Sequence, residues 1–279
     1  MKEIGAVVLN YKNYLETEKC VNSLLGQKGI QIHIVIVDNG SGNESCSYLS
    51  EKFCNAGNVE VIALKTNLGY AKGNNVGIRH LLGKKVKDIL ICNSDVQFVS
   101  DKTVMQLAEE YEEGVAVILP IITNPNGELD QRVMYPQKYL YLRIMKHVLT
   151  RLLNLGSPRA GQKKEKYIKE SGRISGLQEN NYVISGSAFL LTKDYFKVYH
   201  GLFPRTFLYY EEWATILLIH KAGLKCKIAE SDSIIHLGGA STPDEIKNMS
   251  KQSKKLRDES RLKILGLLFT PAFIAKRIY

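Results

Sequence analysis

The segment Ile89-Leu90-Ile91-Cys92-Asn93-Ser94-Asp95 carries more information about the fold than any other part of this chain. Its first four residues are all apolar, which is typical of a strand buried on both faces of a parallel sheet. The strand then runs into three polar residues, at the position where open α/β sheets bind their ligands. The segment therefore predicts a parallel sheet with a binding site at its carboxyl edge.

Three earlier segments repeat this arrangement of an apolar strand with a polar end. We predict strands at residues 4–9, 32–37 and 59–64, and a fifth at residues 115–119. Helical patterns separate them, for example over residues 70–82, and this alternation indicates βαβ units. The polar ends contain Asn10 and Tyr11, Asp38 and Asn39, and Asn67 and Gly69. Since parallel strands end at one edge, the four polar ends predict a single site.

The composition limits the class of protein. The chain has 279 residues, of which 44% are hydrophobic and 24% charged, so we expect one globular α/β domain or one domain with a lobe. The net charge of +10 favours anionic partners such as nucleotides, nucleic acid or an acidic membrane. No nucleic-acid recognition motif accompanies the charge, and we expect no nucleic-acid binding.

The cysteines and the apolar runs indicate a compartment. The five cysteines are scattered without a CxxC pair, which fits a reducing environment. The first residues lead directly into a strand instead of a signal peptide, and no apolar run is long enough to span a bilayer. We expect a cytoplasmic protein that can lie at the inner face of the cell membrane.

The alternation of predicted strands and helices ends after Pro120. We expect a basic amphipathic helix at residues 138–154, a polar loop at 157–176, a helix at 208–222, short strands at 225–229 and 233–236, and a basic helical segment from 246 onward. The expected division is at residues 1–120, 121–240 and 241–279, and the last part is a basic helical segment. The basic segments fit either helices on an anionic membrane or solvated faces over ordinary core contacts.

Asp95 is a candidate metal ligand. A nucleoside diphosphate carries charge that Mg²⁺ or Mn²⁺ neutralises when it bridges a carboxylate and the phosphates. Asp95 follows a buried strand directly and is well placed for this role. An ordinary turn is the alternative interpretation of the triplet Asn93-Ser94-Asp95.

Two other polar ends suggest nucleotide contacts. Asp38 can accept a hydrogen bond from the ring N–H of a pyrimidine, and Asn39 and Ser41 can contact ribose, although an Asx-turn explains the same residues. At the next strand end, Gly69 permits close backbone approach, and Lys72 adds charge toward a phosphate at the start of a helix. The absence of a G-x-G-x-x-G fingerprint argues against a dehydrogenase.

The second half contributes acid–base candidates. Glu211 and Glu212 open a predicted helix, where they either interact with the helix dipole or act as a general base for a sugar hydroxyl. His236 ends a short strand before Gly238-Gly239, and is either structural or a ligand of phosphate or metal.

These motifs, taken in order, resemble the family 2 glycosyltransferases of GT-A fold, especially the bacterial rhamnosyltransferase-like branch. The resemblance covers about residues 3–240. It is carried by Val8-Leu9-Asn10-Tyr11, Val37-Asp38-Asn39-Gly40-Ser41, Asn67-Leu68-Gly69-Tyr70, Gly73-Asn74-Asn75, Asn93-Ser94-Asp95, Ser185-Gly186-Ser187, Gly201-Leu202-Phe203 and Tyr209-Tyr210-Glu211-Glu212.

The resemblance implies a sheet flanked by helices and an inverting sugar transfer from a nucleoside diphosphate to a hydroxyl. It also implies that residues 1–120 bind the nucleotide-sugar, and that residues 121–240 are the acceptor-binding and catalytic half of the same domain. By analogy, Glu212 is the base, preceded by Glu211, Asp95 binds Mn²⁺ or Mg²⁺, and His236 lies near the metal or diphosphate. Asp38 binds the nucleotide base. The remaining donor-binding residues implied are Asn10, Tyr11, Asn39, Asn67, Gly69, Lys72, Asn74, Asn93, Ser94, Ser185 and Gly186.

The substrates follow from the resemblance only in outline. We expect a UDP- or dTDP-sugar rather than a GDP-sugar, with rhamnose or a hexose, and a lipid-linked glycan acceptor in capsule or cell-wall synthesis. Two residues depart from the family pattern: Asn93 stands at the first position of the metal motif, and Ala214 replaces a usual carboxylate. The second departure leaves open a non-catalytic nucleotide-sugar-binding subunit of another transferase. A nucleotidyltransferase is disfavoured because the first strand lacks a Gly- and Arg-rich phosphate loop.

Overall fold

The computed structural model describes residues 2–130, 134–136, 142, 145–146, 149–150, 153, 181–182, 186–238 and 243–278. The predicted loop at 157–176 and the candidate Ser185 lie outside these residues. Of the helix predicted at 138–154, six residues are described: Leu142, Met145, Lys146, Leu149 and Thr150 are helical, and Leu153 is in a turn.

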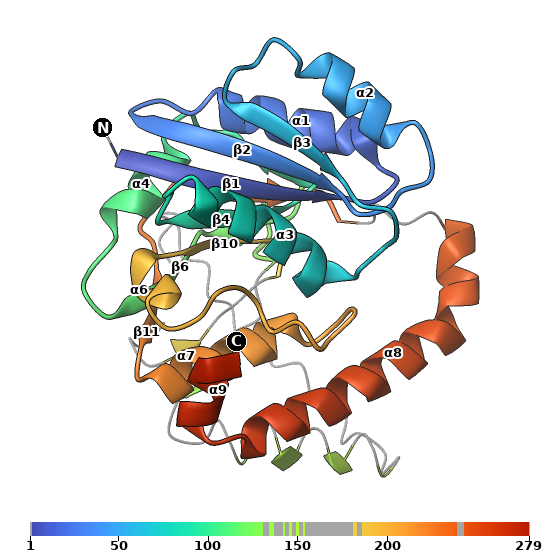
Figure 1. Ribbon diagram of the computed structural model, residues 1–279, viewed down its shortest axis with the longest axis vertical. Coiled ribbons are helices and arrows are strands. Elements are labelled where there is room, and N and C mark those ends of the chain that lie inside the picture. Colours follow the sequence, from blue (N-terminus) through green and yellow to red (C-terminus); the bar gives the residue numbers. More distant parts are fainter. Residues whose placement is uncertain are drawn as a thin grey trace.

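The centre of the molecule is a seven-stranded sheet in the order β11-β6-β10-β4-β1-β2-β3 (Figure 1). The five strands predicted in the first 120 residues are all present in it. Its strands are β1 (Lys2–Asn10), β2 (Ile30–Asp38), β3 (Val59–Ala63), β4 (Ile89–Asn93), β6 (Val115–Leu119), β10 (Ala188–Leu191) and β11 (Lys225–Ile228).

The sheet is mainly parallel, as the apolar runs predict. β1 lies at its middle and pairs in parallel with β2 and with β4, and β2 pairs in parallel with β3. The carboxyl ends of these four strands therefore share one edge. β10 departs from the pattern because it runs antiparallel to both β4 and β6.

Helices cover both faces of the sheet because its strands are apolar on both faces. α1 (Tyr14–Leu25), α2 (Ser45–Lys52) and α4 (Thr103–Glu109) pack on one face, with a core that includes Val8 and Ile36. α3 (Tyr70–Gly83) and α7 (Glu211–Ala222) pack on the other, with a core that includes Val7 and Val37. The alternation of Val7 and Val8 between the two cores follows from the twofold period of a strand. The short α6 (Lys193–Phe196) follows β10.

A second, three-stranded sheet positions the end of the β4 segment. It consists of β5 (Val96–Phe98), β12 (Ile234–His236) and β7 (Ile122–Thr123). β5 and β12 are antiparallel and pair His236 with Val96. This pairing brings Asp95, the residue before Val96, close to the end of β12. A two-stranded ladder joins β8 (Met134–Pro136) and β9 (Asn181–Tyr182).

The C-terminal segment is helical, as predicted, and consists of α8 (Pro243–Phe269) and α9 (Ala272–Ile278). Ile264, Leu267, Leu268 and Ala275 are buried in the same core as α7, so this segment is part of the packed molecule. Figure 1 shows α8 as a long rod across the α7 side, with α9 against α7. Within the described residues, every helix is too short or too polar to cross a bilayer.

Candidate active site

The ends of β1 and β2 are joined by a buried polar cluster. Asn10 and Asp38 face each other in register, and Asn10 Nδ2 donates to Asp38 Oδ2 at 2.7 Å. Ser41 donates to the same carboxylate twice, from its hydroxyl at 2.7 Å and from its backbone N–H at 3.0 Å. Asp38 is only 3% exposed and therefore anchors its own turn, as the Asx-turn interpretation expected.

Asn39 connects this turn to the end of β3. Its Nδ2 donates to Asn67 Oδ1 at 3.0 Å, and its Oδ1 accepts from the backbone N–H of Leu68 at 3.0 Å. Asn67 Oδ1 also accepts from the N–H of Gly69 at 2.8 Å. The predicted residues Asp38, Asn39, Asn67 and Gly69 therefore form one hydrogen-bonded edge.

Gly69 is the point where this edge meets the second half of the chain. Its φ is +81°, and a Cβ there would lie 2.3 Å from the backbone oxygen of Phe207. The next N–H, of Tyr70, donates to that same oxygen at 2.8 Å. The close backbone approach expected of Gly69 is thus made by the protein's own Phe207, and the first N–H of α3 is used in that contact.

A pocket of about 240 Å³ opens between the two halves of the chain. It lies where the end of β4 meets the start of α7. Its lining consists of Tyr70, Asn93, Gly186, Ser187, Leu208, Tyr209, Glu211, Glu212 and His236. The predicted donor-binding residues Asn93 and Gly186 and the predicted acid–base residues therefore share one cavity.

The two glutamates occupy different environments within this pocket. Glu211 is 9% exposed, and burial, followed by the charge of Glu212, raises its pKa to about 8. Glu212 is half-buried and lies against the Gly186 backbone, where a Cβ would stand 2.7 Å from Glu212 Oε1. Glycine at 186 therefore leaves room for the Glu212 carboxylate.

Tyr70 closes the pocket on the α3 side. Its hydroxyl donates to the Gly186 carbonyl at 2.5 Å. Burial and the charges of Glu212 and Glu211 raise its pKa well above the ordinary value, so it remains a neutral donor. Tyr70 belongs to the motif Asn67-Leu68-Gly69-Tyr70, but the sequence does not indicate its place in the pocket, because nothing local shows that the start of α3 meets the start of α7.

Asp95, His236 and Asp130 form a second polar group. His236 Nε2 lies 3.3 Å from Asp95 Oδ2, and its Nδ1 lies 2.6 Å from Asp130 Oδ2. The hydrogen bond with Asp95 is the first reason that the pKa of His236 rises to about 9, and Asp130 adds to the effect against burial. Asp95 itself is 8% exposed. The sequence does not indicate a role for Asp130, because this residue follows a turn with no recognisable motif.

The Asp95 and His236 side chains fit a divalent metal as a partial ligand set. A carboxylate oxygen and an imidazole nitrogen suit Mn²⁺, and Mg²⁺ commonly takes its other ligands from phosphates and water. Among the residues described, no three His, Cys, Asp or Glu side chains are grouped to hold a metal ion. A metal at Asp95 would therefore need oxygens from a nucleotide or water, and His236 would have to lose its proton to bind it.

The other predicted residues are placed as follows. Tyr11 and Lys72 are exposed, Ser94 is half-buried, and none of the three lines the pocket. Asn74 is fully buried and its Nδ2 donates to the Tyr70 carbonyl at 3.0 Å. Ala214 is buried in the core with α3 and α8, so a carboxylate at that position would enter an apolar core and not the pocket.

The structure has a mainly parallel sheet with polar groups along its carboxyl edge and a pocket against the second half, an arrangement that GT-A transferases share. Residues 6–199, which are more than half of the chain, match the family described as "Glycosyl transferase family 2". The chain therefore belongs to this family of glycosyltransferases. The rhamnosyltransferase-like branch stays a prediction.

One curated relative is the low-salt glycan biosynthesis hexosyltransferase Agl10 of Haloferax volcanii. It is 25% identical over 129 residues, which are 46% of this chain and 39% of Agl10. The chain thus aligns with well under half the length of that relative.

Solved structures of S. aureus TarS share the fold. TarS 1–349 in complex with UDP has a TM-score of 0.55 at 16% identity, over 95% of this chain and 70% of that one. TarS 1–349 in complex with UDP-GlcNAc gives 0.52 at 15% identity, with the same coverage. At these identities the likeness shows a common fold.

Proposed function

We propose that this glycosyltransferase moves a hexose or deoxyhexose from a UDP- or dTDP-sugar to a hydroxyl of a glycan acceptor, with inversion at the anomeric carbon. The shared pocket carries this proposal. It brings Asn93 at the end of β4, His236 beside Asp95, and the Glu211-Glu212 pair to one cavity. A sugar transfer requires the donor diphosphate and the attacking hydroxyl to lie together in one cavity of this kind.

The proposed donor contacts follow the polar edge. Asp38 Oδ1 accepts one hydrogen bond, from Ser41 N–H, and a carboxylate oxygen can accept another from the ring N–H of uracil or thymine. The UDP and UDP-GlcNAc complexes of the structurally similar TarS support a uridine nucleotide. We propose the following further residues as contacts of the nucleotide-sugar donor: Asn10, Tyr11, Asn39, Asn67, Gly69, Lys72, Asn74, Ser94, Ser185 and Gly186.

Glu212 is the proposed general base. It is the less buried glutamate, while Glu211, with a pKa of about 8, is largely protonated at pH 7. In the proposed step the Glu212 carboxylate takes the proton of the acceptor hydroxyl, the oxygen bonds to the anomeric carbon, and the bond from that carbon to the diphosphate breaks. A divalent metal held by Asp95 and His236 would supply positive charge against the departing diphosphate.

A membrane surface is the proposed location of the acceptor. Phe269 and Phe273 are 71% and 67% exposed at the α8–α9 junction, and the exposed cations Lys276 and Arg277 follow. Exposed aromatic groups beside cations are typical of proteins that lie on anionic lipid. This supports a lipid-linked glycan as the acceptor, in the synthesis of a surface polysaccharide.

Thermal stabilisation by nucleotides tests the proposal first. The protein is melted with UDP, dTDP, GDP or CMP, each with Mn²⁺, Mg²⁺ or EDTA. A ligand that binds only the folded state at 100 times its Kd stabilises by about 2.7 kcal/mol. We expect a rise in Tm of several degrees with UDP or dTDP that depends on the metal and is lost in Asp95→Asn.

The matched control is Asp232→Asn, which removes an exposed carboxylate near β12 and should keep the full shift. Glu212→Gln should also keep the shift but lose at least 100-fold in kcat for transfer from the nucleotide-sugar that binds. No shift with any nucleotide would contradict the proposal. A shift without turnover of any donor sugar would favour the non-catalytic subunit instead.

A further inference from the structure

The loop before α7 has an unusual backbone. Tyr209 and Tyr210 have φ values of +73° and +70°, in the left-handed region that side chains other than glycine rarely adopt. Among the described residues, they are the one pair of neighbouring non-glycine residues in which both have a positive φ. Tyr210 is the N-cap of α7 and makes no side-chain capping hydrogen bond. Something outside the loop must therefore hold this conformation.

Three side chains of α8 contact three successive residues of this loop. Ser260, which is 1% exposed, donates its hydroxyl to the Leu208 carbonyl at 2.9 Å. The next two contacts come from arginines one turn apart on the same face of α8. The Arg257 guanidinium lies 4.6 Å from the centre of the Tyr209 ring, and Arg261 Nε donates to the Tyr210 hydroxyl at 2.7 Å.

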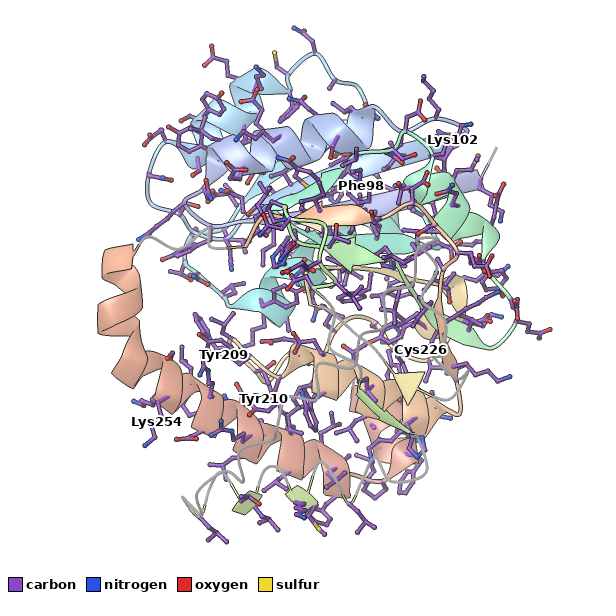
Figure 2. The ribbon with its side chains drawn as sticks, turned by 180° about the vertical axis from the view of Figure 1, so that it is seen from behind. Phe98, Lys102, Tyr209, Tyr210, Cys226 and Lys254 are labelled. Carbon is purple, nitrogen blue, oxygen red and sulfur yellow. The ribbon has the colours of Figure 1, made fainter. Side chains whose placement is uncertain are left out.

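Arg261 is itself fixed in place. Its guanidinium pairs with Asp258 of the same helix and lies 5.4 Å from the centre of the Tyr210 ring. A planar guanidinium can donate from its edge and stack through its face, whereas a lysine ammonium cannot reproduce both contacts. Figure 2 shows Tyr209 and Tyr210 on the inner side of α8, while Lys254 projects from its outer side.

The loop is held from its other side as well. The Phe207 carbonyl accepts from Tyr70 N–H at 2.8 Å, and Gly69 packs directly against the Phe207 backbone. Residues 207–210 therefore lie between the start of α3 and the middle of α8. The residues that follow are Glu211 and Glu212, and the pocket is lined by Leu208 and Tyr209 together with both glutamates.

We propose that Arg257, Ser260 and Arg261 are positioning residues, which hold the left-handed Tyr209-Tyr210 turn and thereby set where the Glu211 and Glu212 carboxyl groups lie. The inference rests on the proposed function in one respect, namely that these carboxyl groups act on the acceptor. In a well-oriented site, a displacement of about 1 Å can lower the rate on the order of 100-fold. The basic C-terminal helix therefore contributes to catalysis without touching the substrate.

Hydrogen exchange tests the structural half of the proposal without any substrate. We compare amide exchange over residues 206–213 in the full chain and in the variants Arg261→Ala, Tyr210→Phe and Lys254→Ala. Arg261→Ala should speed exchange in this segment at least tenfold. Tyr210→Phe removes the hydroxyl that accepts the Arg261 bond and keeps the aromatic ring, and should give a smaller increase in a fully folded protein. Lys254→Ala removes the same charge from the outer side of α8 and should leave exchange unchanged.

Turnover of the UDP- or dTDP-sugar identified by nucleotide binding tests the catalytic half. Arg261→Ala should lower kcat 10- to 100-fold, with the donor KM and the UDP-induced rise in Tm within twofold of the native values. Arg261→Lys should not restore kcat, because a lysine ammonium cannot make both contacts of the guanidinium. In a Tyr210→Phe background, the further effect of Arg261→Ala on kcat should shrink, because the two changes remove one contact.

Three results would overturn the proposal. Equal exchange over residues 206–213 in Arg261→Ala, Tyr210→Phe and the native protein would show that α8 does not hold the turn. Faster exchange with an unchanged kcat, or an equal loss of kcat in Lys254→Ala, would remove the positioning role. If no donor sugar is turned over by the native protein, the proposed function fails, and the exchange measurement still decides whether α8 holds the turn.

Discussion

The adjacent residues Glu211 and Glu212 differ because the helix start buries them unequally. Glu211 lines the pocket but is only 9% exposed, so its carboxyl is largely desolvated. Glu212 lies at the pocket against Gly186. The sequence offered both as a base or as helix-dipole partners, and their burial favours Glu212 for the base.

The buried Glu211 carboxyl should make stability depend on pH. Its pKa is about 8 in the folded protein, against an ordinary value near 4.5. Between these values the folded state binds one more proton than the unfolded state, so the free energy of unfolding falls as pH rises and levels off above pH 8. We expect Glu211→Gln to gain on the order of 2–4 kcal/mol relative to the native protein between pH 5 and pH 9.

Urea unfolding of both proteins at pH 5, 7 and 9 measures this difference. Comparison with Glu211→Gln isolates the group, since other groups contribute equally to both proteins. A free-energy difference that stays constant across the three pH values would show that Glu211 ionises in the fold as it does in water.

Among the elements, the start of α3 does most to join the two halves. The loop that ends at Gly69 is held by Asn39 and Asn67 on the sheet side, and Gly69 and Tyr70 contact the Phe207 backbone on the other. One turn later, Asn75 exchanges two hydrogen bonds with the backbone of Leu202, at 2.8 and 2.6 Å. α3 therefore fixes the loop that precedes the glutamates relative to the polar edge.

Gly69→Ala should break this junction. The alanine would need a φ of +81°, and its Cβ would lie 2.3 Å from a backbone oxygen that cannot easily move. We expect a loss of at least about 2 kcal/mol in the free energy of unfolding and a weaker rise in Tm with UDP. Gly83→Ala is the control, because Gly83 ends the same helix with open space around its Cβ position, and it should be neutral or slightly stabilising. Equal effects of the two changes would rule out the close contact at Gly69.

At the scale of the whole molecule, the C-terminal helices have two different faces. One face buries Ile264, Leu267 and Leu268 with α7, and Lys221 of α7 donates to the Leu268 and Thr270 carbonyls at the end of α8. The other face exposes Phe269 and Phe273 beside cations. The same segment therefore supports the candidate site and presents the proposed membrane surface.

Vesicle flotation tests that surface. The protein should float with phosphatidylcholine vesicles that contain phosphatidylglycerol, and less with phosphatidylcholine alone. Phe269→Ala with Phe273→Ala should lower the partition coefficient at least about tenfold, because burying each aromatic side chain is worth about 1.5–3 kcal/mol. Leu15→Ala with Val99→Ala is the control, since both side chains are exposed elsewhere, and it should bind like the native protein. Equal partition of the two double variants would contradict the proposed surface.

The sequence by itself determined the parallel half of the fold. Strands such as β4 are apolar on both faces and end at polar residues, so their type, burial and common edge follow from local patterns alone. The polar residues of that edge, such as Asp38 and Asn67, could be predicted for the same reason. A strand period and a turn are properties of a few consecutive residues, and the sequence displays them directly.

Only the tertiary structure decided which distant groups meet. The antiparallel insertion of β10 between β4 and β6, the contact of Tyr70 with Gly186, and the position of Asp130 beside His236 each join residues about 70 or more positions apart. The left-handed turn at Tyr209 and Tyr210 could not be predicted locally either, because tyrosine does not favour that backbone and the side chains that contact the turn come from α8, about 50 positions later. Such contacts depend on the packing of the whole chain, since no single segment contains the groups that form them.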